Sequence, residues 1–60
     1  MPHIELKVPP RPVEAKRELV EQLTDLVARI YQVSEEKWMV HIIECTKENI
    51  GSGGKLLVDK

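Results

Sequence analysis

The chain begins with Met1-Pro2-His3-Ile4-Glu5-Leu6-Lys7-Val8, and the other segments are interpreted outward from this stretch. From His3 to Val8, polar and apolar side chains alternate without a break. A period of two places successive side chains on opposite faces, as in a strand with one face covered. The strand should end at Pro9-Pro10, because proline has no N–H group to donate to a sheet ladder. The sequence therefore predicts a first strand over residues 3–8.

Pro2, just before this strand, has two interpretations. If Met1 is removed, the ring nitrogen of Pro2 becomes a free secondary amine that can act as a base or a nucleophile. While Met1 is retained, the lone pair of that nitrogen is delocalised into the peptide bond, and it can do neither. Proline at the second position is also common at processed, ill-ordered chain ends. The residue alone does not decide between a catalytic and a merely terminal proline.

Arg11 lies in a loop in which three of four residues are proline, Pro9-Pro10-Arg11-Pro12. Proline fixes φ and stiffens the loop. Arg11 is therefore either a solvated loop arginine or a guanidinium held rigidly for a carboxylate, which it can grip with two hydrogen bonds. Apolar side chains at helical spacing then predict an amphipathic helix over residues 13–31, about 28 Å long. Pro12 suits the helix N-terminus.

A second strand is predicted over residues 38–44, after a connection at 32–37 in which Ser34 is a candidate cap. Trp38, Val40 and Ile42 should share one face, and Met39, His41 and Ile43 the other. Because nearly all of these side chains are apolar, both faces should be covered, one by the helix and one by another subunit. His41 is interpreted as a satisfied histidine in that packed layer.

The remaining residues are a polar loop at 46–49 and the glycine-rich Gly51-Ser52-Gly53-Gly54. This segment lacks the lysine spacing of a phosphate-binding loop and opens no helix, so a turn or hairpin is the better interpretation. The predicted fold class is α+β, with the whole of residues 1–60 as a single domain. It is a β-α-β subunit with a parallel two-stranded sheet and a small C-terminal hairpin. Its open sheet edges and one bare face favour pairing with further copies.

Composition excludes several classes of protein. The 60 residues carry a net charge of −1, which is not the footprint of a nucleic-acid binder. No apolar run is long enough to cross a membrane and no signal peptide is visible, so we expect a cytoplasmic protein. The single cysteine, Cys45, excludes an intrachain disulfide. His3, His41 and Cys45 are too few for a structural zinc site, so neither a metal nor a cofactor is expected. Oligomerisation is then the expected source of additional buried surface.

Together these features resemble the 4-oxalocrotonate tautomerase family over the whole chain. The resemblance depends on the order and spacing of several segments. These are Pro2 after the initiator Met, the strand 2–7, Arg11 in the next loop, the amphipathic helix, the strand 40–44, and the segment 47–54 with its Lys47 and G-x-G-G hairpin.

The resemblance implies subunits that dimerise into a four-stranded sheet and assemble into a homohexamer, a trimer of dimers. It implies that Pro2 is the catalytic base, its amine pKa lowered by an apolar site. Arg11 matches the loop arginine that binds a substrate carboxylate, although the loop is one residue shorter here. The partner is then a small 2-oxo acid or its enol, without a cofactor, nucleic acid or membrane.

Two positions depart from the family pattern. Met39 stands where the typical member has a second arginine, and Ile50 stands where an aromatic residue usually precedes the G-x-G-G. Both align with substrate-binding positions, but methionine cannot stabilise an enolate by charge. A monocarboxylate enol, such as an aryl or alkyl enolpyruvate, then fits better than a dicarboxylate dienol. A lysine could replace the missing charge, although each candidate is more simply a solvated surface residue: Lys7, Lys37 and Lys47.

Three functions remain compatible with the sequence. The first is an enzyme that interconverts enol and keto forms of a 2-oxo acid through the free amine of Pro2. The second is a non-catalytic partner subunit of a hetero-oligomeric tautomerase, favoured by Met39 and by any retention of Met1. The third is a small binding module with Arg11 as an anion site. Only the first requires a Pro2 amine that titrates near neutral pH.

Overall fold

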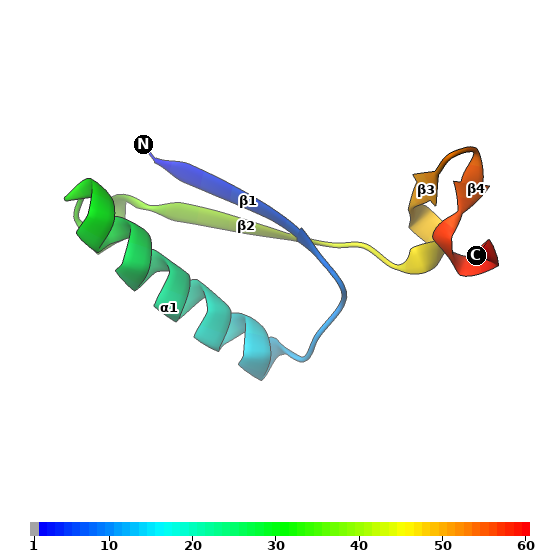
Figure 1. Ribbon diagram of the computed structural model, residues 1–60. Coiled ribbons are helices and arrows are strands. Elements are labelled where there is room, and N and C mark those ends of the chain that lie inside the picture. Colours follow the sequence, from blue (N-terminus) through cyan, green and yellow to red (C-terminus); the bar gives the residue numbers. More distant parts are fainter. Residues whose placement is uncertain (1) are drawn as a thin grey trace.

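The computed structural model describes residues 2–60 and shows a helix lying along a pair of strands, with a small hairpin held apart at the C-terminal end (Figure 1). Strand β1 (His3–Val8), helix α1 (Val13–Tyr31) and strand β2 (Met39–Glu44) follow in that order. Strands β3 (Gly51–Ser52) and β4 (Lys55–Leu56) form the hairpin. Single 3-10 turns complete the described chain: Glu35–Lys37, Lys47–Asn49 and Leu57–Asp59. The predicted β-α-β subunit with a terminal hairpin is confirmed.

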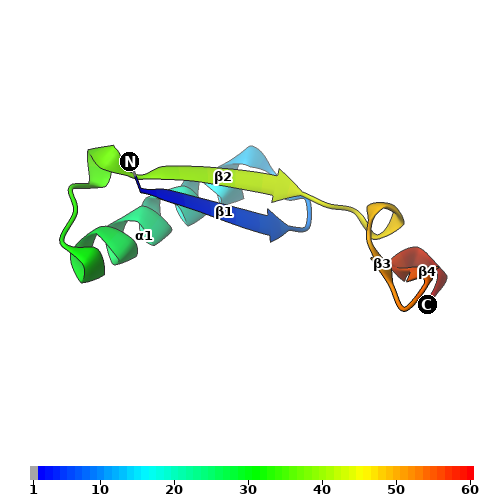
Figure 2. The ribbon, with the colours of Figure 1, turned by 90° about the horizontal axis from the view of Figure 1, so that it is seen from above.

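The two long strands pair in parallel, with His3 opposite Met39 and Val8 opposite Glu44. Figure 2 shows them side by side, with α1 crossing one face of the pair. The second strand begins at Met39, one residue later than the predicted start at Trp38. The reason is that the backbone N–H of Trp38 closes the preceding 3-10 turn by donating to the carbonyl of Glu35 at 3.1 Å.

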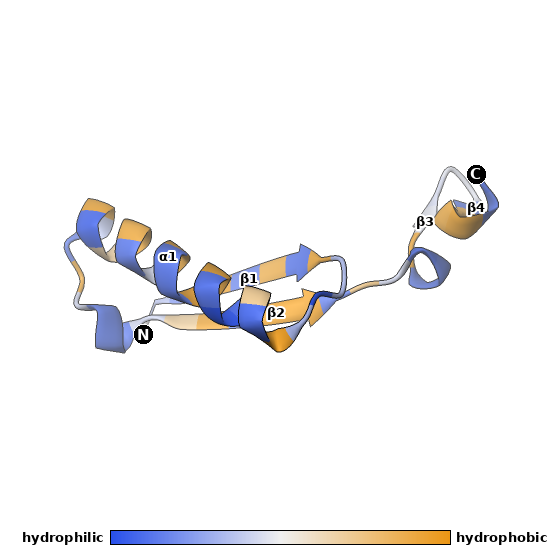
Figure 3. Ribbon diagram, turned by 90° about the horizontal axis from the view of Figure 1, so that it is seen from below, coloured by the Kyte–Doolittle hydropathy of each residue, from blue (hydrophilic) through white to orange (hydrophobic). Residues whose placement is uncertain are grey.

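The apolar stripe of α1 covers the face of the sheet that the alternation predicts. Apolar and polar bands alternate along β1 in Figure 3. The side chains of the covered face are half-buried: Ile4, Leu6, Val8, Val40 and Ile42. Gln32 ends the helix in the left-handed conformation, with φ 55°, and its N–H donates to the carbonyl of Ala28. One layer of contacts therefore joins the helix to the sheet.

The glycine-rich segment turns the chain back on itself. Gly53 and Gly54 have φ values of 61° and 86°, and they join β3 to β4 as a two-residue turn. Positive φ at both central residues matches the twist of an antiparallel hairpin and is easiest for glycine. The prediction of a hairpin rather than a phosphate-binding loop is confirmed.

The folded chain leaves much apolar surface uncovered. No residue between 2 and 60 is fully buried. The radius of gyration is 14.7 Å, whereas a compact domain of this length has about 10 Å. The accessible surface is 4958 Å², against about 4,000 Å² for a typical monomer of this mass. The single chain is therefore more extended and more exposed than a compact monomer of its length.

Within the described part of the chain, no helix is both long and apolar enough to cross a membrane.

Candidate active site

Pro2 lies at the start of β1 beside a cleft of about 380 Å³, whose walls include Val27, Tyr31, Val33 and Trp38. The cleft is formed where the C-terminal part of α1 and the connection to β2 approach the first strand. The carbonyl of Pro2 accepts a hydrogen bond of 3.0 Å from the N–H of the first residue of β2, so its backbone is anchored to the sheet. An amine at this position would therefore be held next to mostly apolar side chains.

The aromatic wall of this cleft is fixed by two contacts. The rings of Tyr31 and Trp38 meet edge to face, with centroids 5.8 Å apart. The indole N–H of Trp38 donates to the carbonyl of Val33 at 3.2 Å. Ser34 precedes the expected short turn, but its hydroxyl makes no capping hydrogen bond. The orientation of Trp38 thus depends on the Val33 carbonyl rather than on a serine cap.

Met39 occupies the same end of the sheet as Pro2. It pairs with His3 in the parallel register, and its N–H is the donor to the Pro2 carbonyl. Its side chain is 43% exposed. Three lysines were candidates to supply the charge that Met39 lacks: Lys7, Lys37 and Lys47. All three are exposed, and none of them takes part in an ion pair among residues 2–60.

Arg11 lies at the opposite end of β1. The backbone N–H of Arg11 donates to Glu44 Oε2 at 2.9 Å, and Glu44 is the last residue of β2. The guanidinium donates through Nη1 to the carbonyl of Pro10 at 2.6 Å. Since a strand rises about 3.3 Å per residue, β1 separates Pro2 from this end by about 20 Å. A single chain therefore brings Pro2 and Met39 together, but not Pro2 and Arg11.

The surroundings of Arg11 suit an anion. Arg11 and Lys16 both line a cleft of about 130 Å³ between the proline-rich loop and the start of α1, with Leu19 as an apolar neighbour. The guanidinium keeps donors beyond the one used by Pro10. A carboxylate with an apolar tail would find charge and apolar contact together in this cleft.

Glu44 is a positioning residue that the sequence interpretation missed. Its Oε2 accepts the Arg11 N–H and lies 3.2 Å from Lys16 Nζ, so one carboxylate joins the loop, the helix and β2. The backbone hydrogen bond from Arg11, and then the hydrogen bond and charge of Lys16, lower the pKa of Glu44 below its ordinary value. The signal available in the sequence was a carboxylate at the end of the second strand. The parallel register places this residue opposite Val8, directly beside the proline-rich loop.

Replacing this carboxylate by an amide should loosen the Arg11 loop. We expect Glu44→Gln to be less stable than the parent protein at neutral pH. Because the folded-state pKa of Glu44 is lowered, its stabilising effect is present above the unfolded value and is lost as pH falls through the folded value. Chemical denaturation at several pH values should show the two proteins converging in acid. A stability difference that stays constant to low pH would contradict this role, and Glu48→Gln is the matched control.

Ile50 directly precedes β3. The hairpin lies beyond the carboxyl end of β2 and away from the N-terminal end of the sheet (Figure 1). Ile50 is half-buried, and its carbonyl accepts the N–H of Leu57 at 2.8 Å. Within one chain it reaches neither Pro2 nor, through any hydrogen bond of the described residues, Arg11. The four residues predicted for substrate and catalysis thus fall into three separate places on the subunit.

The sequence profile of a family described as tautomerase enzyme matches residues 2–60. The chain therefore belongs to the tautomerase family. It is similar to the crystal structure of DmpI from Archaeoglobus fulgidus, with 40% identity over 97% of this chain and 100% of that one, at a TM-score of 0.85.

Two further solved structures agree with this assignment. YwhB, described as a homologue of 4-oxalocrotonate tautomerase, is 38% identical over 98% of both chains, with a TM-score of 0.87. TTHB242, a 4-oxalocrotonate tautomerase homologue, is 33% identical over 100% of this chain and 97% of that one, with a TM-score of 0.84. No protein in the curated collection matches. The resemblance expected from the sequence is thus confirmed at the level of family and fold.

Proposed function

We propose that the chain is a tautomerase in which the free N-terminal amine of Pro2 is the general base. The observation that carries this proposal is the position of Pro2 beside an apolar cleft at the start of β1. Desolvation disfavours the charged form of an amine and lowers its pKa. Removal of Met1 would therefore leave an amine that is partly uncharged near neutral pH and able to accept a proton.

The proposed reaction moves one proton and one double bond. The Pro2 amine removes the hydroxyl proton of an enol, the oxygen becomes a carbonyl, and the carbon–carbon double bond shifts or is lost. The resulting prolyl ammonium returns a proton to carbon, so that amine and substrate balance without a cofactor. The walls of the cleft, which include the Trp38 ring, are mostly apolar, so the substrate meets few competing polar side chains there.

The substrate we propose is a 2-oxo acid with one carboxylate, or its enol. Arg11 is the residue expected to bind the carboxylate, because its guanidinium offers two parallel donors. Met39, at the Pro2 end, contributes apolar contact and no charge. Ile50 is the proposed apolar contact from the C-terminal segment. An aryl or alkyl enolpyruvate fits this combination of one cation and several apolar groups.

The separation of Pro2 from Arg11 is best resolved by a second copy of the chain. Two copies related by a two-fold axis perpendicular to the sheet would pair their edge strands antiparallel. The Pro2 end of one copy would then lie beside the Arg11 end of its partner, and the two two-stranded sheets would form one sheet of four strands. Three such dimers, forming a hexamer, could cover the exposed apolar residues of the C-terminal segment, Leu56 and Val58.

The test is an enol-to-keto assay on phenylenolpyruvate and 2-hydroxymuconate, with protein whose intact mass shows that Met1 is absent. We expect turnover of both enols and higher kcat/KM for phenylenolpyruvate. Higher kcat/KM for the dicarboxylate would overturn the single-cation substrate assignment. Absence of turnover on either enol would overturn the enzyme proposal and favour a partner subunit.

The 3-10 turn that follows the hairpin, Leu57–Asp59, offers a test of assembly. Val58 is 56% exposed in the single chain, so Val58→Asp should leave the subunit folded while placing a charge in a subunit contact. A buried unpaired charge is costly, and we expect the complex to dissociate into smaller species at concentrations where the parent stays assembled. Light scattering after gel filtration measures the mass. Ser52→Asp, on the neighbouring hairpin, is the control, and an unchanged mass for Val58→Asp would exclude this contact.

A further inference from the structure

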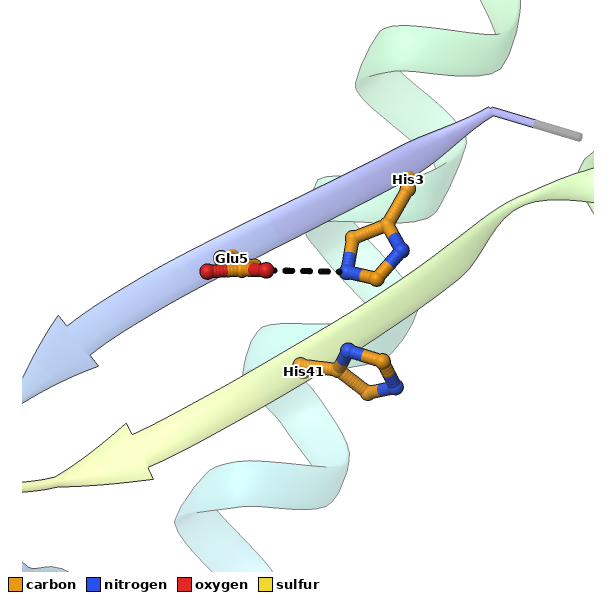
Figure 4. Close-up of side chains that lie close together, drawn as sticks. All are labelled: His3, Glu5 and His41. Carbon is orange, nitrogen blue, oxygen red and sulfur yellow. Dashed lines mark ion pairs between the residues drawn. The ribbon is translucent and has the colours of Figure 1, made fainter.

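The sheet face turned away from α1 carries a cluster of three side chains that the proposed reaction does not use. His3 and Glu5 project from β1 and His41 projects from β2, all on the same side of the strands (Figure 4). The sequence predicted His41 to be a satisfied histidine within a packed layer. In the subunit it is exposed, and its ring meets that of His3 edge to face with centroids 4.3 Å apart.

The strand register brings these groups together. Glu5 lies directly opposite His41 in the parallel pair, and His3 is two residues before Glu5 on the same face. His3 Nε2 lies 3.5 Å from Glu5 Oε1. One nitrogen of each imidazole and one oxygen of the carboxylate all lie within 4.8 Å of one another. The convergence is built into the backbone pairing, because neighbouring residues of paired strands have close Cβ atoms.

These donors are chemically suited to a divalent transition metal. Imidazole nitrogen and carboxylate oxygen are both zinc ligands, and two histidines with one carboxylate leave coordination positions open for water. Metal bonds of about 2.0–2.1 Å bring tetrahedral ligand atoms to about 3.3 Å from one another. The widest separation of up to 4.8 Å would close by about 1.5 Å through side-chain rotation, while the paired strands stay in place.

We propose that His3, Glu5 and His41 form a binding site for a divalent transition metal of the zinc type. Counting histidines and cysteines in the sequence did not reveal it, because the third ligand is a carboxylate that only the parallel register brings beside His41. Cys45 lies beyond the end of β2 and is not part of the cluster. The site binds metal through the subunit's own residues and does not depend on the chemistry of Pro2.

Titration calorimetry of the metal-free protein with zinc chloride tests the proposal. We expect each chain to bind one zinc ion with a Kd of roughly 1 μM. His41→Gln should weaken binding roughly a hundredfold, because one of three protein ligands is lost. Glu5→Gln should weaken it as well, whereas Glu48→Gln and Cys45→Ser should bind as the parent does. Binding that survives His41→Gln, or that disappears with Cys45→Ser, would overturn the assignment.

A second measurement needs no substitution. The chain has two histidines, and both belong to the cluster. Zinc should therefore shift the ring-proton resonances of both imidazoles together in a proton NMR titration, and a chelator should restore them. Unchanged ring signals at saturating zinc would show that any bound metal lies elsewhere. A calorimetric stoichiometry below one zinc per chain would show a site shared between copies and would overturn a site held by each subunit alone.

Discussion

Replacing Pro2 with alanine should lower kcat/KM for enol ketonisation by roughly 10²- to 10⁴-fold, the usual contribution of a positioned general base. The substitution exchanges a secondary amine held by its ring for a primary amine on a freer chain end. The carbonyl of residue 2 can still accept the hydrogen bond that joins it to β2, so the fold should persist. Enol disappearance, followed by ultraviolet absorbance, measures the loss.

The matched control is the protein with Met1 retained. It contains the same Pro2 ring, but the ring nitrogen is an amide and has no basic lone pair. It should be inactive, and enzymatic removal of Met1, verified by intact mass, should restore turnover. Full activity with Met1 retained, or in the alanine variant, would exclude Pro2 as the base.

The pH profile of the parent protein provides an independent check of the same amine. The base is active when uncharged, so kcat/KM should rise as pH increases through the prolyl pKa. The apolar cleft should place that rise below the pKa of an exposed prolyl amine. Trp38→Gln would introduce a polar side chain into this wall and should move the rise towards higher pH. If Trp38→Gln and the parent had the same pH profile, the cleft would not be what sets the pKa of the base.

Most of the fold could be predicted from the sequence because its signals are local. Alternation from His3 to Val8 and apolar spacing from Val13 to Tyr31 each depend on residues that lie close together in the chain. The Gly53-Gly54 turn likewise follows from a steric preference of the residues themselves. The start of the second strand was placed one residue early, since side-chain propensity does not report that the Trp38 N–H closes a 3-10 turn.

The sites were harder to predict because they depend on register and on direction along a strand. Arg11 follows Pro2 closely in sequence, yet an extended β1 holds the two apart. Glu44 can hold the Arg11 loop only because the parallel register places the last residue of β2 beside that loop. The metal-binding cluster requires Glu5 to face His41, which neither strand specifies by itself. Pairing between distant segments is thus the information that the single sequence lacks.

Replacing Arg11 with glutamine should lower kcat/KM for a carboxylate-bearing enol by roughly a hundredfold, mainly through a higher KM, because a charged bidentate contact is lost. Arg11 is exposed and its loop is held by its backbone N–H, which glutamine retains. The fold should therefore be unaffected. Arg11→Lys keeps the positive charge but lacks the two parallel donors, so its kcat/KM should lie between those of the parent and of Arg11→Gln. Equal losses with an uncharged enol ester would show that Arg11 does not bind the carboxylate.

Mixing two inactive variants then tests whether Pro2 and Arg11 act from different copies. Pro2→Ala chains retain Arg11, and Arg11→Gln chains retain Pro2. If the site is shared across a two-fold interface, unfolding and refolding an equal mixture should give about a quarter of the sites both groups, and activity should return accordingly. If both groups acted within one chain, no mixed assembly could contain a complete site. Refolded mixtures no more active than the separate variants would therefore exclude the shared site, and the separation of Pro2 from Arg11 along β1 makes the recovery of activity the expected result.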